Sequence, residues 1–348
     1  MHGWQFGVLA IWLSLLTGCQ SLPYYSQTLK GQWQIISQRQ TIDSILRQPN
    51  TSSSLARQLA TIQKIRLFAA ELGLPVKGQF DTYVDVHRPY AMWSVSATPE
   101  LSLQAKTWCY WIVGCLSYRS YFDQSLAEAT EKQLKEQGYD THLSPVAAYS
   151  TLGWFRDSVF SSYINKSEAE LAELLFHELA HQVTYAKNDP IFNESFAEVV
   201  AEEGLKRYFL GQSDYFPKWA LRKKRQQQFA ELVLAHRQKL GTLYADTTLT
   251  VPEKRQQKQQ ILTALRQSYQ RLKTEQWQGY SGYDAWFEQL SNAKLNSIAI
   301  YNSLISPLNA LLVAANLDLP TFYRQCQKLA QLPRQERHRI LTSSSLDP

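Results

Sequence analysis

Charged residues are scarce in this chain, cysteines are few, and the sequence has no internal repeat and no Pro- or Ser-rich linker. Asp, Glu, Lys and Arg make up 19% of the 348 residues and aromatic residues 12%, which excludes a disordered chain and indicates a folded, aromatic-rich body. Without a linker, the sequence does not divide into separate modules. Its length is sufficient for a substantial hydrophobic core, in one large domain or two closely joined ones.

A nucleic-acid-binding motif is also lacking, although the formal net charge is +6. The excess positive charge lies largely in two stretches rich in Gln, Lys and Arg, Lys218–Lys239 and Lys254–Lys273. Such a basic helical face could contact anionic lipid head groups, peptidoglycan-associated polymers or an acidic substrate, but a solvated helix surface is the favoured interpretation. We therefore expect no nucleic acid among the partners.

The first apolar run of the chain is too short to cross a membrane. Phe6–Leu16 has eleven residues, whereas a membrane-spanning helix needs about twenty. The run ends in Leu16-Thr17-Gly18-Cys19, which resembles the bacterial lipobox, so we expect residues 1–18 to be a lipoprotein signal peptide and Cys19 to be lipidated. The alternative is an ordinary signal peptide with an incidental Cys. No Lys or Arg precedes the run, so an upstream start and an atypical signal both stay open.

The residue after Cys19 bears on the destination of the protein. In the Gram-negative pattern, Gln20 in place of Asp suggests the outer membrane. We therefore expect a protein of the bacterial cell envelope, with its body soluble and facing the periplasm and its acyl chains in the membrane.

Three further cysteines are compatible with an oxidising compartment. Cys109 and Cys115 bracket a five-residue segment that a disulfide can close if a turn forms near Gly114. A metal site is the alternative, but no His-rich partner lies nearby, so the disulfide is favoured. Cys326 is left over, and we expect it to be a buried free thiol.

The segment His177-Glu178-Leu179-Ala180-His181 carries the clearest chemical signal. A helix advances about 100° per residue, so side chains four residues apart share one face. His177 and His181 can therefore bind one Zn²⁺ ion from the same side, while Glu178 reaches a water on the metal without binding the metal itself. A bare HExxH pattern also arises by chance, so its context matters.

The context supports a real helix followed by a second one. Ser167 and Glu170 form a capping-box pattern ahead of an apolar stripe at helical spacing. After a break at Asn188-Asp189-Pro190, Asn193-Glu194 opens another helical pattern. Glu194 is therefore a candidate third ligand.

Periodicity elsewhere predicts an α+β fold that is predominantly helical, with a small sheet before the HExxH helix and a helical C-terminal half. The expected helices before that sheet and within it are Leu29–Ile45, Ser53–Leu72 and Asp123–Gln137, and the expected strands are Thr82–Val86, Tyr90–Ala97, Trp108–Leu116 and Val146–Phe155. We expect 19–160 to hold the N-terminal helices and sheet, 161–212 the metal-site helices and 213–348 a helical region, with 19–160 and 161–348 in one compact unit.

These motifs resemble the zinc site of the gluzincin peptidases, in which a Glu on the helix after HExxH is the third ligand. The chain departs from that group in two respects: only twelve residues separate His181 from Glu194, and a Gly-x-Met-Glu-Asn segment is lacking. A closer resemblance, to the bacterial predicted aminopeptidase family of lipoproteins, covers nearly the whole chain. Its motifs here are Tyr24-Tyr-Ser-Gln27 with Gly31-Gln32, Trp108-Cys109, Val113-Gly-Cys-Leu-Ser-Tyr-Arg119, Ala148-Tyr-Ser-Thr-Leu-Gly-Trp154 and the zinc motif.

The resemblance implies a role for each residue of the motif. His177, His181 and Glu194 would bind one Zn²⁺ ion and leave a fourth position for water. Glu178 would be the general base. Glu198, one turn after Glu194, would accept a hydrogen bond from a ligand imidazole, although a surface acid is the alternative.

Other assignments stay more open. Glu202 and Glu203 could bind a substrate ammonium or be ordinary helix surface. The strand Ala148–Trp154 could pair with a bound peptide backbone, or its aromatic residues could belong to the core. An oxyanion-stabilising Tyr or His is expected, and Tyr301 is one candidate.

The function implied is that of a zinc-dependent peptidase acting on periplasmic peptides, and the family's name suggests an aminopeptidase. An endopeptidase is one alternative. Another is a lipoprotein that uses a gluzincin scaffold for binding in envelope assembly, with weak or no catalysis. The presence of Glu178 favours turnover, because a binding scaffold has no need of a general base.

Overall fold

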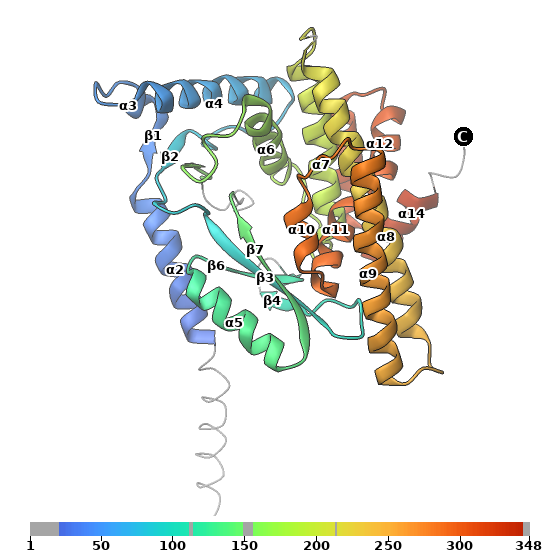
Figure 1. Cartoon of the computed structure of the whole chain (residues 1–348). Helices are drawn as coiled ribbons and strands as arrows, with labels where there is room; N and C mark the ends of the chain where they lie inside the picture. Colours follow the sequence, from blue (N-terminus) through green and yellow to red (C-terminus); the bar gives the residue numbers. More distant parts are fainter. Residues whose placement is uncertain (1–20, 111–113, 149–155, 213, 344–348) are drawn as a thin grey trace, which may run out of the picture.

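The computed structural model describes residues 21–110, 114–148, 156–212 and 214–343 (Figure 1). The predicted signal peptide with Cys19 lies outside these residues, as does most of the predicted strand Val146–Phe155. Within them the fold is α+β and predominantly helical, and small sheets precede the HExxH helix. The predicted fold class is confirmed, while the likeness to gluzincins stays a prediction.

The N-terminal part is helical with one interruption. It contains α2 (Ser21–Ser37), β1 (Gln40–Thr41), α3 (Ile42–Leu46) and α4 (Ser53–Glu71). The predicted helix Leu29–Ile45 is wrong at residues 38–41, which divide it into α2 and α3. Gln40 and Thr41 pair with a strand, and the Thr41 hydroxyl caps α3 by accepting a hydrogen bond from the Ser44 amide. α4 agrees with its prediction, and Gly73, with φ +76°, follows its C-cap.

The central sheet has β3 (Met92–Pro99) between two antiparallel neighbours, β6 (Tyr118–Tyr121) and β7 (Tyr139–Val146). One face of β3 carries Trp93, Val95 and Ala97, which are buried with residues of α5 (Gln124–Glu136). β7 departs from the prediction, which placed a strand only from Val146 onward. Its sequence has few β-branched residues, and pairing with β3 along its whole length stabilises it instead.

Two smaller sheets complete the strands of the described chain. β2 (Thr82–Val84) joins β1 and β8 (Val159–Phe160) in a second sheet, and β4 (Trp108–Tyr110) forms a hairpin with β5 (Gly114–Leu116). β8 leads into the HExxH helix.

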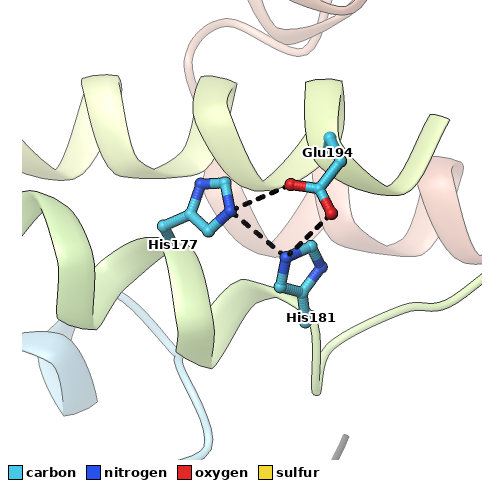
Figure 2. Close-up of side chains that lie close together, drawn as sticks. All are labelled: His177, His181 and Glu194. Carbon is cyan, nitrogen blue, oxygen red and sulfur yellow. Dashed lines mark hydrogen bonds and ion pairs between the residues drawn. The ribbon is translucent and has the colours of Figure 1, made fainter. Parts of the chain in front are cut away.

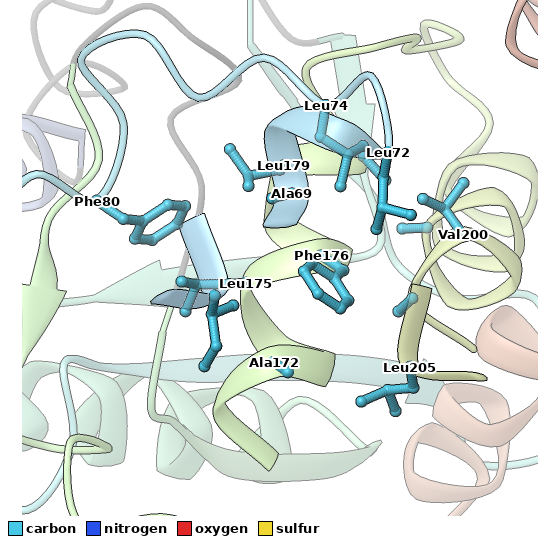
Figure 3. Close-up of a cluster of buried hydrophobic side chains, with 14 of the residues drawn as sticks. Ala69, Leu72, Leu74, Phe80, Ala172, Leu175, Phe176, Leu179, Val200 and Leu205 are labelled. Atoms are coloured by element: carbon cyan, nitrogen blue, oxygen red, sulfur yellow. The ribbon is translucent and has the colours of Figure 1, made fainter. Parts of the chain in front are cut away.

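The main hydrophobic core surrounds the two helices of the metal motif, α6 (Glu168–Ala180) and α7 (Pro190–Tyr208). Phe176 of α6 is fully buried among side chains of α4 and α7 (Figure 3). Gly204 of α7 makes this approach possible, because a Cβ atom there would lie 2.7 Å from the Phe176 ring and 3.0 Å from Leu72. Core packing therefore sets the spacing between the two helices.

The described C-terminal part consists of helices joined by connections. Its elements are α8 (Tyr215–Ala245), α9 (Val251–Glu275), α10 (Asp284–Glu288), α11 (Asn292–Asn302), α12 (Ile305–Ala314), α13 (Leu319–Gln331) and α14 (Arg334–Ser343). α8 and α9 form a long helical pair along one side of the molecule (Figure 1). They share a second core, centred on Val233, Leu265 and Tyr269.

One stretch, Asn292–Ala314, is long and apolar enough to cross a membrane by length and composition alone. In the fold it is divided into α11 and α12, which pack against α7, and α11 also contacts α8 and β3. Leu295 and Leu308 are fully buried in the two cores. Part of the stretch thus serves as internal packing.

Candidate metal centre

The two histidines of the motif project from the end of α6. The helix begins at a capping box in which the Ser167 hydroxyl accepts a hydrogen bond from the Glu170 amide and the Glu170 carboxylate accepts one from the Ser167 amide. His177 lies in the last turn and His181 is the C-cap residue. Because they are four residues apart, their Nε2 atoms lie only 3.2 Å from each other.

Glu194 approaches the same point from α7. Asp189 caps this helix at its N-terminus and Pro190 occupies its first position, so Glu194 lies early in α7. Its carboxylate oxygens are 3.3 Å from His177 Nε2 and 3.9 Å from His181 Nε2 (Figure 2). The three ligand atoms lie within 4.8 Å of one another.

This donor set fits a tetrahedral metal ion. Ligand atoms about 2.0–2.1 Å from a tetrahedral metal lie about 3.3 Å from each other. The His177–His181 and His177–Glu194 separations of 3.2 and 3.3 Å match that value. Burial lowers the pKa of His181 to about 4, so its imidazole is neutral at pH 7, the form that binds metals. The cluster could therefore bind a metal ion.

The charge of the cluster also favours a cation. Burial alone would lower the pKa of His177, but the hydrogen-bonded carboxylate of Glu194, with Glu178 and Glu198, raises it to about 9. The three carboxylates thus stabilise a positive charge at the position of His177.

Glu178 lies beside this cluster and faces the same cavity. Burial raises the pKa of its carboxyl to about 7, an effect that Glu194 increases and His177 opposes. A carboxyl group with a pKa near neutrality can both accept and release a proton at physiological pH.

A second layer of charged residues surrounds the ligands. Glu198 Oε2 lies 3.9 Å from His177 Nδ1. The ammonium group of Lys223, on α8, lies 2.7 Å from Glu198, 3.4 Å from Glu173 and 3.7 Å from Glu202. Although burial opposes it, Lys223 lowers the pKa of Glu198, which stays ionised. Lys223 was not predicted, because it stands in a basic run that resembles solvated helix surface; its side chain is only 16% exposed.

The other two acids of α7 have local partners. Glu202 also contacts Lys206 at 3.1 Å, and Glu203 contacts Arg207 at 2.8 Å. Neither is among the described residues that line the cavity. The arrangement therefore gives no support to a substrate-ammonium site at these residues.

The cluster opens into a cavity of about 550 Å³ between the central sheet and α11. Tyr118 of β6 and Tyr185, in the connection between α6 and α7, line it beside the ligands. Desolvation and the nearby carboxylate of Glu194 raise the pKa of both hydroxyls, so both are protonated donors. Of the predicted strand Ala148–Trp154, Ala148 lines the cavity and the rest lies outside the described residues, as does the side chain of Tyr301.

Neither tyrosine was singled out from the sequence. For Tyr118 a signal existed, since it belongs to the motif Val113-Gly-Cys-Leu-Ser-Tyr-Arg119 that carried the family resemblance. For Tyr185 the spacing of the metal motif offers no such signal.

Cys109 and Cys115 are joined by a disulfide across the β4–β5 hairpin, and Cys326 is a buried free thiol. The hairpin contacts the connection between the two metal-motif helices, where the Cys115 amide donates a hydrogen bond to Asn188 Oδ1 at 2.8 Å. Gly114, with φ +81°, permits this contact, because a Cβ atom there would lie 2.2 Å from the same oxygen.

Comparison with known proteins agrees with the motifs. Residues 23–341 match the model of a family described as "Putative aminopeptidase". No curated protein and no solved structure matches the chain. Since the family match covers most of the sequence, the chain belongs to this family of putative aminopeptidases, and its membership indicates a peptidase.

Proposed function

We propose that the protein is a zinc-dependent peptidase in which His177, His181 and Glu194 bind one Zn²⁺ ion. The observation that supports this most strongly is the convergence of two imidazole nitrogens and a carboxylate beside Glu178, in the wall of a cavity. Two His and one Glu form a known ligand set for catalytic zinc, which keeps one position open.

Zinc bound there would acidify a coordinated water and polarise the scissile carbonyl. The carboxylate of Glu178 would accept a proton from the attacking water and deliver it to the leaving amine. The hydroxyls of Tyr118 and Tyr185 would donate hydrogen bonds to the developing oxyanion. Glu198 would orient the His177 ring through its Nδ1 atom.

The predicted lipid anchor at Cys19 would place this activity at the bacterial outer membrane, facing the periplasm. The disulfide between Cys109 and Cys115 supports an oxidising compartment. The substrates would be periplasmic peptides. An aminopeptidase would need a free amino terminus on its substrate, whereas an endopeptidase would cleave an N-acetylated peptide equally well.

The decisive experiment compares the zinc-loaded protein with its Glu178→Gln variant on a peptide library read by mass spectrometry. We expect Glu178→Gln to keep about one zinc per chain and to lose activity about 100-fold or more, because only the proton transfer is removed. Glu275→Gln, which changes an exposed carboxylate of α9, is the matched control and should retain full activity.

Metal analysis of the ligand variants tests the site independently of turnover. His177→Ala and Glu194→Ala should each lose most of the zinc, and Glu198→Gln should bind it about tenfold more weakly. Full zinc occupancy in Glu194→Ala would reject Glu194 as the third ligand. Equal activity of the wild type and Glu178→Gln on every peptide would reject the enzyme.

A further inference from the structure

The central strand β3 has two faces of opposite character. Trp93, Val95 and Ala97 are buried against α5, whereas the alternate residues Ser94 and Ser96 line the cavity. Serine is not among the residues that favour strands. Strand stability therefore does not account for two serines side by side on the cavity face.

The register of the sheet extends this pattern into a row of three serines. Ser94 lies opposite Ser120 on β6 and opposite Ser144 on β7, and all three line the cavity. Neighbouring strands are about 4.8 Å apart, so this serine row is about 10 Å long. Within the part of the chain that the structure describes, none of the three hydroxyls has a hydrogen-bond partner, which leaves them available to a ligand.

The next row of the sheet connects the serine row to the metal cluster. It consists of Tyr118, Ser96 and His142, two residues along β3 from Ser94. Tyr118 is electrostatically coupled to Glu194 and lines the cavity beside it. Since two residues of a strand span about 7 Å, a peptide bound at the metal would place a neighbouring side chain near the serine row.

Beyond the metal cluster, the described residues that line the cavity include no charged side chain. Among the described residues that line it, Glu178 and Glu194 are the only acids, and there is no Lys or Arg. His142 is neutral as well, because burial and the nearby Lys294 lower its pKa to about 4. Across from the sheet, Asn296 and Ser297 of α11 add further uncharged hydrogen-bonding groups.

This arrangement discriminates by charge. A Lys, Arg, Asp or Glu side chain at the serine row would lose its hydration at a part of the cavity where the described lining offers no counter-charge, which is costly. An uncharged polar side chain would exchange water for the free serine hydroxyls, and the small serine side chains leave it room. We propose that the peptidase prefers substrates with Ser, Thr, Asn or Gln next to the scissile bond, and that Ser94, Ser120 and Ser144 determine this preference. The inference rests on the proposed peptidase function.

The test uses peptides of one backbone in which a residue beside the scissile bond is Ser, Asn, Leu, Lys or Glu. We expect the zinc-loaded wild type to show a kcat/KM about tenfold or more higher for Ser or Asn than for Lys or Glu. Ser94→Asp places a carboxylate in the middle of the serine row and should raise the Lys-to-Glu ratio of kcat/KM about 10- to 100-fold. Ser94→Asn is the matched neutral control and should leave that ratio unchanged.

Two results would overturn the inference: a wild type that prefers Lys, Glu or Leu, or a Lys-to-Glu ratio that Ser94→Asp leaves unaltered. If Ser94→Asp fails to fold by circular dichroism, Ser144→Asp on the neighbouring strand replaces it.

A binding measurement separates this inference from the peptidase proposal. Fluorescence anisotropy with the Glu178→Gln variant should give a Kd at least about tenfold lower for the Ser peptide than for the Lys peptide. If the wild type cleaves no peptide but this ratio holds, the peptidase proposal fails and the specificity of the cavity stands. Equal Kd values reject the specificity, whatever the activity.

Discussion

At the scale of single residues, Lys223 joins three carboxylates that would otherwise repel one another. Its ammonium group contacts Glu173 of α6 and Glu198 and Glu202 of α7, and all four side chains are less than a quarter exposed. The cation thus connects α8 to both helices of the metal motif. Its removal would leave like charges close together with little solvent to screen them.

Lys223→Met should therefore lower the free energy of unfolding by about 2 kcal/mol, less than the loss of a fully buried partner because water reaches part of the cluster. Urea denaturation measures this. Lys224→Met, at the exposed neighbouring position, is the control and should have little effect. A Lys223→Met protein as stable as the wild type would show that the contacts contribute nothing to the fold.

Sequence alone was sufficient to predict which side chains of the motif the structure brings together. His177, Glu178 and His181 needed only the helical period, and Glu194 needed one further helix. Lys223 could not be found in this way, because its role depends on α8 folding back across α6 and α7. Within a run of basic residues, the neighbouring sequence does not distinguish a buried lysine from a solvent-exposed one.

At the scale of secondary structure elements, the separation of α6 and α7 depends on a residue without a side chain. Gly204 faces Phe176 at a distance that leaves no room for a branched side chain. Gly204→Val should destabilise the protein by about 2 kcal/mol or more, since overpacking exceeds the small gain in helix propensity.

Thermal and urea unfolding would measure the effect of Gly204→Val. Gly241→Ala in α8 is the matched control: its new methyl group would meet only the end of the Leu103 side chain, at 3.3 Å, so a change below about 1 kcal/mol is expected. Equal effects of the two substitutions would refute close packing at Gly204.

Elements with strong local signals were predicted well, whereas two strands that depend on distant partners, β7 and β1, were not. α6 has its capping box and apolar stripe in the sequence, and the structure shows both. β7 has few β-branched residues and no apolar alternation, and its stability comes from β3, forty or more residues away. β1 interrupted a predicted helix for the same reason, because its partner is distant in sequence.

At the scale of the whole molecule, one hydrophobic core contains residues from Ile35 to Leu341, so the C-terminal helix belongs to the same body as the metal motif. Asp189, the N-cap of α7, connects the two directly. Its fully buried carboxylate contacts Arg337 and accepts a hydrogen bond from His338 at 2.8 Å, both from α14. The position of Glu194 thus depends on the end of the chain.

This connection predicts a pH dependence of stability. Burial opposes ionisation of Asp189, but His338 and Arg337 hold the pKa of its carboxyl below the ordinary value of 3.8. A carboxyl group whose pKa is lower in the folded than in the unfolded protein stabilises the fold at pH values above its unfolded-state pKa. This contribution is lost as the pH falls below about 4 and through the folded-state pKa. Asp189→Asn should cost about 3 kcal/mol at pH 7, because Arg337 would keep no buried counter-charge.

Urea unfolding at pH 7 and between about pH 2 and 4 measures both effects. The wild type should lose stability in the acidic range more steeply than Asp189→Asn, while Glu275→Gln should follow the wild type. Parallel curves for the wild type and Asp189→Asn would exclude this carboxylate as a source of acid sensitivity.

The two-faced strand β3 also has an evolutionary consequence. Its odd-numbered codons, 93, 95 and 97, specify the packing against α5, and its even-numbered codons, 94 and 96, specify the wall of the cavity. Point mutations at the even positions could therefore give descendants new substrate preferences without loss of the fold. A single-codon insertion or deletion would exchange the two sets and destroy both at once. Selection should consequently tolerate variation at alternate positions of this strand while keeping its length constant.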